Sequence, residues 1–222
     1  MGNNNHSIKT KLLFHFRIIL RRTPLFPRLH LYKQNKILQD WIDGGKSTPP
    51  PHIFKQTTIK EFAFKFNVHT LVETGTFLGD MIGAVEGNFE EIYSIELNEF
   101  LYKISCKRFA HSDHIQLLYG DSGEILGELI NTIDKPCLFW LDGHYSAGYT
   151  AKGNLETPIL RELAHISQHP YHEKDIILID DARCFTGEGD YPGIQILEEW
   201  ASANGYDRFD VQDDIIRIYR TR

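Results

Sequence analysis

Four side chains that could carry out metal or proton chemistry follow two apolar segments. Asp142 and His144 lie just past one segment, and Asp180 and Asp181 directly follow another. Carboxylate oxygens are the ligands that Mg²⁺ prefers, and an imidazole can accept a proton near neutral pH. We predict Asp142, Asp180 and Asp181 as metal ligands, with Asp180 favoured over Asp181 because strand residues alternate in direction. Asp142 and His144 are the predicted catalytic residues. The alternative is that the acids cap loops and the histidine lies at the surface.

A second stretch, ETGTFLGD, contains Glu73, Gly75, Thr76 and Gly79 at a predicted strand-to-helix turn. Glycine at such a turn lets a ligand approach the backbone at a helix N-terminus. The spacing G-x-x-x-G differs from the dinucleotide fingerprint G-x-G-x-x-G. Moreover, the Glu73 carboxylate would repel a pyrophosphate and attract an amino group. The loop therefore indicates a cofactor with a cationic end, although it could also be a turn without a ligand.

Two further acids follow the next two apolar segments. Glu96 ends the first of them, 21 residues after Gly75, where a carboxylate can accept hydrogen bonds from ribose hydroxyls. Asp121 and Ser122 follow the second. They could contact an adenine amino group or cap the next helix, and these two roles are compatible.

The elements that must position these residues alternate regularly along the chain. Short apolar segments alternate with helical patterns, which predicts βαβ units and a parallel sheet. The carboxyl ends of its strands lie at one edge, where the acids would gather. The predicted strands are 70–73, 92–96, 115–119, 137–141 and 175–179, and the predicted helices are 79–87, 98–109, 122–133, 157–168 and one near 192–203.

Residues 206–211 and 214–220 are two further β-rich segments, separated only by Gln212 and Asp213. So short a link permits a hairpin but no parallel crossover. We therefore expect an α/β fold, a Rossmann-like doubly wound sheet of seven strands. It is mostly parallel, with an antiparallel C-terminal hairpin strand and an N-terminal helical extension.

The glycine loop, the acids after strands two and three, and the terminal hairpin together resemble class I S-adenosylmethionine-dependent methyltransferases over about residues 55 to 220. The resemblance implies that the loop lies against the methionine part of the cofactor. It also implies that the acids serve the amino group, the ribose and the adenine. The implied cofactor-binding residues are Glu73, Gly75, Thr76, Gly79, Glu96, Asp121 and Ser122.

The acids after strands four and five resemble the metal-dependent O-methyltransferases, the macrocin type more closely than the catechol type. The macrocin type has Asp-Gly-Asp after strand four, whereas this chain has His144 at the third position. The resemblance implies O-methylation of a small polar acceptor, a saccharide or natural product, with Mg²⁺ assistance. Two alternatives are a nicotinamide-dependent oxidoreductase and a non-catalytic cofactor-binding domain docked through its N-terminal helix.

Two long loops, 143–156 and 182–191, follow the same strands and would form the acceptor pocket. Tyr145, Lys152 and Arg183 are the predicted substrate-binding residues, because aromatic faces and cationic donors suit a polar acceptor. Solvated loop side chains are the alternative interpretation. Further aromatic candidates are Tyr149, Phe185 and Tyr191.

The chain has 222 residues and a formal charge of −6, which is unevenly distributed. Eight bases precede the first acid, Asp40, so the remainder has 16 bases against 30 acids, a charge of −14. An acidic domain is poorly suited to binding nucleic acid, whereas a basic N-terminal segment can bind phosphate groups or anionic lipid. We predict a basic helical extension with a proline-rich linker over 1–51 and the methyltransferase domain over 52–222.

Within the extension, residues 10–22 have the spacing of a basic amphipathic helix, and 34–42 that of a second helix. The first would pack on the domain, or residues 9–36 would contact a membrane surface or a partner protein. The three cysteines form no CxxC pair, which argues against disulfides and zinc and favours a reducing cytoplasm. No segment predicts a signal peptide or a membrane span, and the oligomeric state stays open, a homo-oligomer included.

Overall fold

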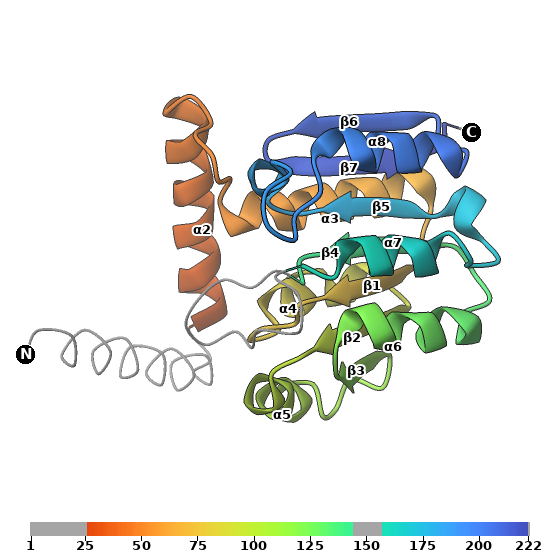
Figure 1. Ribbon diagram of the computed structural model, residues 1–222. Coiled ribbons are helices and arrows are strands. Elements are labelled where there is room, and N and C mark those ends of the chain that lie inside the picture. The colour runs from red at the N-terminus through yellow and green to blue at the C-terminus, as the bar shows by residue number, and fades with distance from the viewer. Residues whose placement is uncertain (1–25, 144–156, 222) are drawn as a thin grey trace, which may run out of the picture. The chain divides into compact units, whose positions relative to one another are not determined.

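The computed structural model describes residues 26–143 and 157–221 (Figure 1). The chain divides into two units, residues 1–47 and residues 48–222. The first contains helix α2 (Phe26–Asp43), which is longer than the helix predicted over 34–42. The indole of Trp41, in the last turn of this helix, donates a 2.5 Å hydrogen bond to the carbonyl oxygen of Ser47. The helix predicted over 10–22 lies outside the described residues.

The second unit contains a seven-stranded sheet in the order β3-β2-β1-β4-β5-β7-β6. The first five strands pair in parallel, and β7 is antiparallel to both β5 and β6. This confirms the predicted seven-stranded sheet with its antiparallel terminal hairpin. The strands are β1 (Thr70–Thr74), β2 (Glu91–Glu96), β3 (Ile115–Tyr119), β4 (Cys137–Leu141), β5 (Ile176–Ile179), β6 (Arg208–Gln212) and β7 (Ile215–Tyr219).

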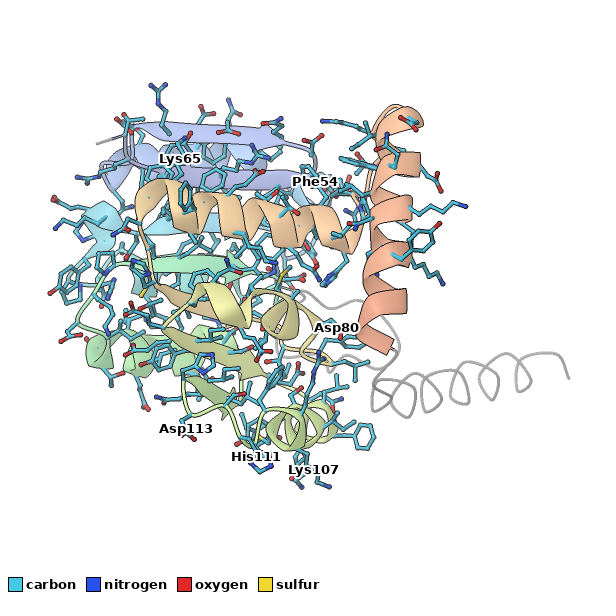
Figure 2. All side chains as sticks on the ribbon, turned by 180° about the vertical axis from the view of Figure 1, so that it is seen from behind. Phe54, Lys65, Asp80, Lys107, His111 and Asp113 are labelled. Atoms are coloured by element: carbon cyan, nitrogen blue, oxygen red, sulfur yellow. The ribbon has the colours of Figure 1, made fainter. Side chains whose placement is uncertain are left out.

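Helices cover both faces of the sheet, as Figures 1 and 2 show from opposite sides. Two buried apolar clusters lie under them, one for each face. On one face lie α3 (His52–Phe66), α4 (Asp80–Val85) and α5 (Glu99–Arg108); on the other lie α6 (Ser122–Leu129), α7 (Ile159–Ile166) and α8 (Ile194–Ala203). Short 3₁₀ turns are η1 (Glu86–Asn88), η2 (Ile130–Thr132), η3 (His172–Lys174) and η4 (Ala182–Cys184).

Helix α3 was not predicted from the sequence, and its burial pattern explains why. Phe64 is 91% exposed, whereas Thr58 is buried at 3% exposure, so apolar spacing does not mark one face of this helix. Its start and its end are marked in Figure 2 by Phe54 and Lys65. The Lys65 ammonium lies 5.2 Å from the centre of the Tyr219 ring on β7. Packing against the sheet, rather than local periodicity, stabilises this helix.

Local signals fix several of the turns at the carboxyl edge of the sheet. Asn98 caps α5 by accepting from two backbone N–H groups, and Asp121 caps α6 by accepting from the N–H of Gly123. The hairpin turn lies at Asp213 and Asp214, both with positive φ, one residue later than predicted. Among the described residues, no helix combines the length and apolar character needed to cross a bilayer.

Candidate functional site

The glycine loop follows β1 and is hydrogen-bonded to the end of β2. The N–H groups of Gly75 and Thr76 donate to the carbonyl oxygen of Ile95 at 2.9 and 3.3 Å. The Glu96 carboxylate accepts from the N–H of Phe77 at 2.7 Å and from that of Asn98 at 2.8 Å. Burial raises the pKa of Glu96, although these backbone donors oppose the shift. Glu96 therefore anchors the loop to the end of β2.

Glu73 and Thr76 lie in the interior beneath this loop. Ser94 Oγ donates to Glu73 Oε2 at 2.5 Å and lies 2.6 Å from Thr76 Oγ1. Glu73 is 1% exposed and Thr76 is 3% exposed. The Thr76 hydroxyl is thus turned inward to Ser94. Burial raises the pKa of Glu73 to about 8, despite the opposing bond from Ser94.

The raised pKa of Glu73 predicts a pH-dependent stability. Its pKa rises from an ordinary 4.5 to about 8, so the folded protein binds a proton that the unfolded chain has released. Stability from this group is therefore lost as pH rises between these values. From about pH 5.5 to about pH 8.5, we expect wild type to lose about 3 kcal/mol of unfolding free energy that Glu73→Gln retains. Urea unfolding at both pH values measures this loss, and Glu90→Gln, at an exposed position, is the control. An equal change of unfolding free energy with pH in wild type and Glu73→Gln would contradict the prediction.

Asp121 and Ser122 lie at the end of β3, beside α7. Arg161 on α7 donates to both Asp121 oxygens, at 3.2 and 3.0 Å, so Asp121 is a helix cap and an ion-pair partner together. Glu162, the next residue, is 1% exposed, and burial raises its pKa to about 7. Hydrogen bonds from Ser122 and Thr74 oppose that rise. A buried carboxyl group thus lies at this edge beside Asp121 and Ser122.

The main chain brings the acids after β4 and β5 to the end of β1. The N–H of Asp142 donates to the carbonyl oxygen of Thr74 at 3.1 Å, and that of Asp180 to Leu141 at 3.0 Å. Burial, together with the charge of Asp180, raises the pKa of Asp142. Burial raises that of Asp180 to about 6, although Lys55 opposes the shift. The carboxyl edge of β1, β4 and β5 therefore gathers several carboxyl groups, and their burial and mutual repulsion oppose ionisation.

Lys55, on the unpredicted helix α3, supplies a cation to this edge. Its ammonium forms a hydrogen-bonded ion pair with Asp180 Oδ2 and lies 3.4 Å from Asp181 Oδ1. Asp181 has φ of 55°, outside the extended region, so its side chain does not follow the strand alternation assumed above. Both carboxylates consequently reach the same ammonium. The expected division of roles between Asp180 and Asp181 does not follow from this geometry.

Arg183, a predicted substrate residue, is held by two acids. Its guanidinium pairs with Asp214 Oδ2 and lies 2.9 Å from Asp181 Oδ1. Asp214 also accepts from the Arg183 N–H at 2.8 Å. Phe185 is buried at 3% exposure, edge-on to Tyr191. The other predicted residues of this group, His144, Tyr145, Tyr149 and Lys152, lie outside the described residues.

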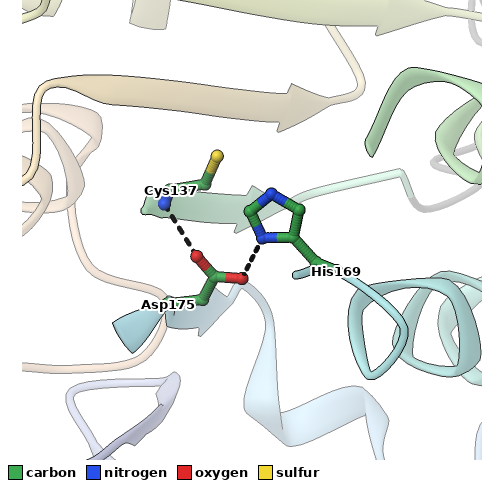
Figure 3. Close-up of side chains that lie close together, drawn as sticks. All are labelled: Cys137, His169 and Asp175. Carbon is green, nitrogen blue, oxygen red and sulfur yellow. Dashed lines mark hydrogen bonds and ion pairs between the residues drawn. The ribbon is translucent and has the colours of Figure 1, made fainter. Parts of the chain in front are cut away.

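A separate polar cluster, Cys137, His169 and Asp175, lies at the opposite, amino-terminal edge of β4 and β5 (Figure 3). His169 Nδ1 lies 2.6 Å from Asp175 Oδ2, and Nε2 lies 3.2 Å from the carbonyl oxygen of Ile133. Asp175 Oδ1 accepts from the N–H of Cys137 at 2.7 Å. Burial raises the pKa of the Cys137 thiol well above its usual range. With both ring nitrogens hydrogen-bonded and the thiol protonated, we interpret this cluster as structural.

Asp175→Ala is expected to lower the unfolding free energy by about 3 to 5 kcal/mol, because it leaves the buried Nδ1 of His169 and the Cys137 N–H unpaired. Glu173→Ala is the control, since the Glu173 side chain is 67% exposed in a surface ion pair with Arg220 and should contribute little. Urea unfolding at neutral pH measures both. A loss for Asp175→Ala no larger than that for Glu173→Ala would refute the structural interpretation.

Comparison of sequences found no protein-family model and no curated protein that matches this chain. Comparison of structures found many matches. One is a candidate caffeoyl-CoA O-methyltransferase of Staphylococcus aureus, with 13% identity and a TM-score of 0.55, over 87% of this chain and 97% of the other. An O-methyltransferase of Bacillus cereus in complex with S-adenosylhomocysteine has 11% identity and a TM-score of 0.52, over 84% and 90%.

A methyltransferase of Podospora anserina with S-adenosylhomocysteine bound has 15% identity and a TM-score of 0.51, over 90% of this chain and 97% of its own. At such low identity the likeness concerns the fold. The chain therefore has the Rossmann-like fold of class I S-adenosylmethionine-dependent methyltransferases, as its sequence motifs led us to expect.

Proposed function

We propose that this chain is an S-adenosylmethionine-dependent O-methyltransferase that acts on a hydroxyl group of a small polar acceptor, such as a saccharide or another natural product. One observation carries the proposal: the glycine loop directly adjoins the acidic strand ends. The two backbones lie so close that a Cβ atom on Gly75 would be only 2.4 Å from the carbonyl oxygen of Asp142. A cofactor bound at the loop would therefore lie next to an acceptor bound at the acids. Two neighbours in fold hold S-adenosylhomocysteine, which supports this choice of cofactor.

The acids at the ends of β1, β2 and β3 suit that cofactor, which when bound would supply an electrophilic methyl group. Glu73 would serve its amino group, because an ammonium nearby favours the ionised carboxylate over the neutral acid. Glu96 would accept from the ribose, and Asp121 with Ser122 would contact the adenine. Gly75, Thr76 and Gly79 would contribute backbone.

The residues after β4 and β5 would bind the acceptor and accept its proton. The acceptor oxygen would gain the methyl group from the cofactor's sulfur, which would keep the electron pair of the broken bond. The oxygen would lose its proton to His144, the proposed general base. Asp142 and Asp180 would orient the hydroxyl group for in-line attack. The proposed acceptor contacts, Tyr145, Lys152 and Arg183, would belong to the following loops.

Mg²⁺ does not fit this group of side chains as they are arranged. The Lys55 ammonium is already bonded to Asp180 and lies close to Asp181, two of the three residues expected to hold the metal. A divalent ion there would be repelled by the ammonium at short range. We derive no step through a metal.

The domain assignment, 1–51 as a basic extension and 52–222 as the methyltransferase domain, is part of the same proposal. So are a cytoplasmic location, peripheral membrane or protein contact through residues 9–36, and the absence of nucleic acid among the partners. The acidic charge of the chain after Asp40 supports the last of these.

Calorimetric titration with S-adenosylmethionine and, separately, with NAD tests the cofactor. Micromolar binding of the first and none of the second supports the proposal, and the reverse result would favour a nicotinamide-dependent oxidoreductase. Binding of neither, with vesicle binding that disappears when residues 1–36 are deleted, would favour a docked non-catalytic domain. Transfer of a labelled methyl group to hydroxyl-bearing acceptors then tests the reaction itself.

A further inference from the structure

The ammonium of Lys55 reaches the place where the sequence predicts a metal ion. Its side chain is 13% exposed, and those of Asp180 and Asp181 are 1% and 23% exposed. The charge of Asp142 also acts on it. A cation from helix α3 therefore balances carboxylates that follow β4 and β5, more than 80 residues later in the chain.

Lys55 is held as a cation by its acidic partners. Its ammonium forms a hydrogen-bonded ion pair with Asp180 Oδ2 and lies 3.4 Å from Asp181 Oδ1. A protonated amine has no lone pair to bind a metal or to accept a proton. Lys55 is therefore a fixed cation here, and neither a ligand nor a base.

The donors of this ammonium suggest a further role. Lysine has three N–H donors, and among the described residues its partners are Asp180 and Asp181. One donor thus remains for an incoming oxygen atom. A metal ion with two open positions could chelate two neighbouring oxygens of an acceptor, whereas a single N–H can bind only one.

We propose that Lys55 takes the place of the divalent metal, so that the site works without a metal ion and selects acceptors that present one oxygen rather than a chelating pair. This inference rests on the proposed methyl transfer and specifies its acceptor. The ammonium stabilises the negative charge that develops on the acceptor oxygen as its proton leaves. Lys55 also positions the carboxylates of Asp180 and Asp181.

A metal titration of the full-length protein tests the inference without requiring activity. Binding of Mn²⁺ is followed by the loss of the electron paramagnetic resonance signal of the free ion. We expect no stoichiometric binding by wild type, and an affinity at least about tenfold higher in Lys55→Ala, where the carboxylates have lost their cation. Lys60→Ala removes a lysine from the same helix and should behave as wild type. Lys55→Gln is the second variant, in case Lys55→Ala does not fold.

Activity then provides an independent readout. Wild-type turnover should be unchanged by a chelator, and Lys55→Ala should lose about 100-fold or more. Stoichiometric Mn²⁺ binding by wild type, or loss of its turnover with the chelator, overturns the inference. Equal Mn²⁺ affinity in wild type and Lys55→Ala overturns it too. If no form transfers methyl groups, the proposed function has failed, and the Mn²⁺ titrations still decide which cation belongs to this place.

Discussion

Replacing Asp142 with Asn is expected to lower the turnover of methyl transfer by about 100-fold or more, the loss expected when the acceptor hydroxyl group is no longer held in line for attack. Asp142 directly follows β4, at the acceptor side of the proposed site, and its N–H donates to the carbonyl oxygen of Thr74. Asparagine keeps the shape and the main-chain bond to Thr74 but cannot ionise. Because Glu73 and Glu96 lie at other strand ends, the dissociation constant for S-adenosylmethionine should change less than about threefold.

Two measurements separate this loss from unfolding. Burial and the charge of Asp180 disfavour the ionised form of Asp142, so Asn should leave the urea-unfolding free energy unchanged or higher. Asp113→Asn, at an exposed position labelled in Figure 2, is the matched control and should keep wild-type turnover. If Asp142→Asn loses turnover and cofactor affinity equally, the division between cofactor side and acceptor side is wrong.

The sheet could be predicted because its strands bury nearly continuous apolar runs. Every residue of β1, β4 and β5 is buried, and the predicted segments match these strands to within one residue. Once the strands are known, the common direction of β1 to β5 places the residues that follow them at one edge. The positions of the predicted acids therefore follow from topology, without any knowledge of their partners.

The partners themselves could not be predicted. Lys55 meets Asp180 across 125 residues of sequence, on a helix whose exposed Phe64 and buried Thr58 conceal its amphipathic pattern. Arg161 likewise contacts Asp121 from a different helix. Such pairs depend on how the helices pack on the sheet, and local spacing carries no signal for them.

Asp214 is a residue that topology could have indicated. An antiparallel last strand must begin at the edge where the parallel strands end, so its preceding turn lies beside the site. The structure places Asp214 there, bonded to Arg183. The acceptor side thus has its cations, Lys55 and Arg183, paired with acids.

Gly75→Ala is expected to weaken binding of S-adenosylmethionine by about 100-fold and to lower turnover as well, in contrast to Asp142→Asn. Gly75 has φ of 87°, a left-handed conformation that costs any other L-residue about 1 to 2 kcal/mol. Its Cβ would also lie 2.4 Å from the carbonyl oxygen of Asp142. That oxygen belongs to the backbone and can move only with the end of β4, at a further cost of about 1 to 3 kcal/mol.

The strain from Gly75→Ala would reach both halves of the proposed site, because β1 and β4 are joined there by the bond from Asp142 N–H to Thr74. Gly87→Ala is the matched control, since a Cβ at Gly87 meets nothing within 4 Å. Calorimetric titration and a methyl-transfer assay on both variants measure the effect. Wild-type cofactor affinity in Gly75→Ala would mean that the glycine loop is only a turn. Loss of both cofactor affinity and turnover, with Gly87→Ala unaffected, would tie cofactor binding and acceptor chemistry to this one backbone contact.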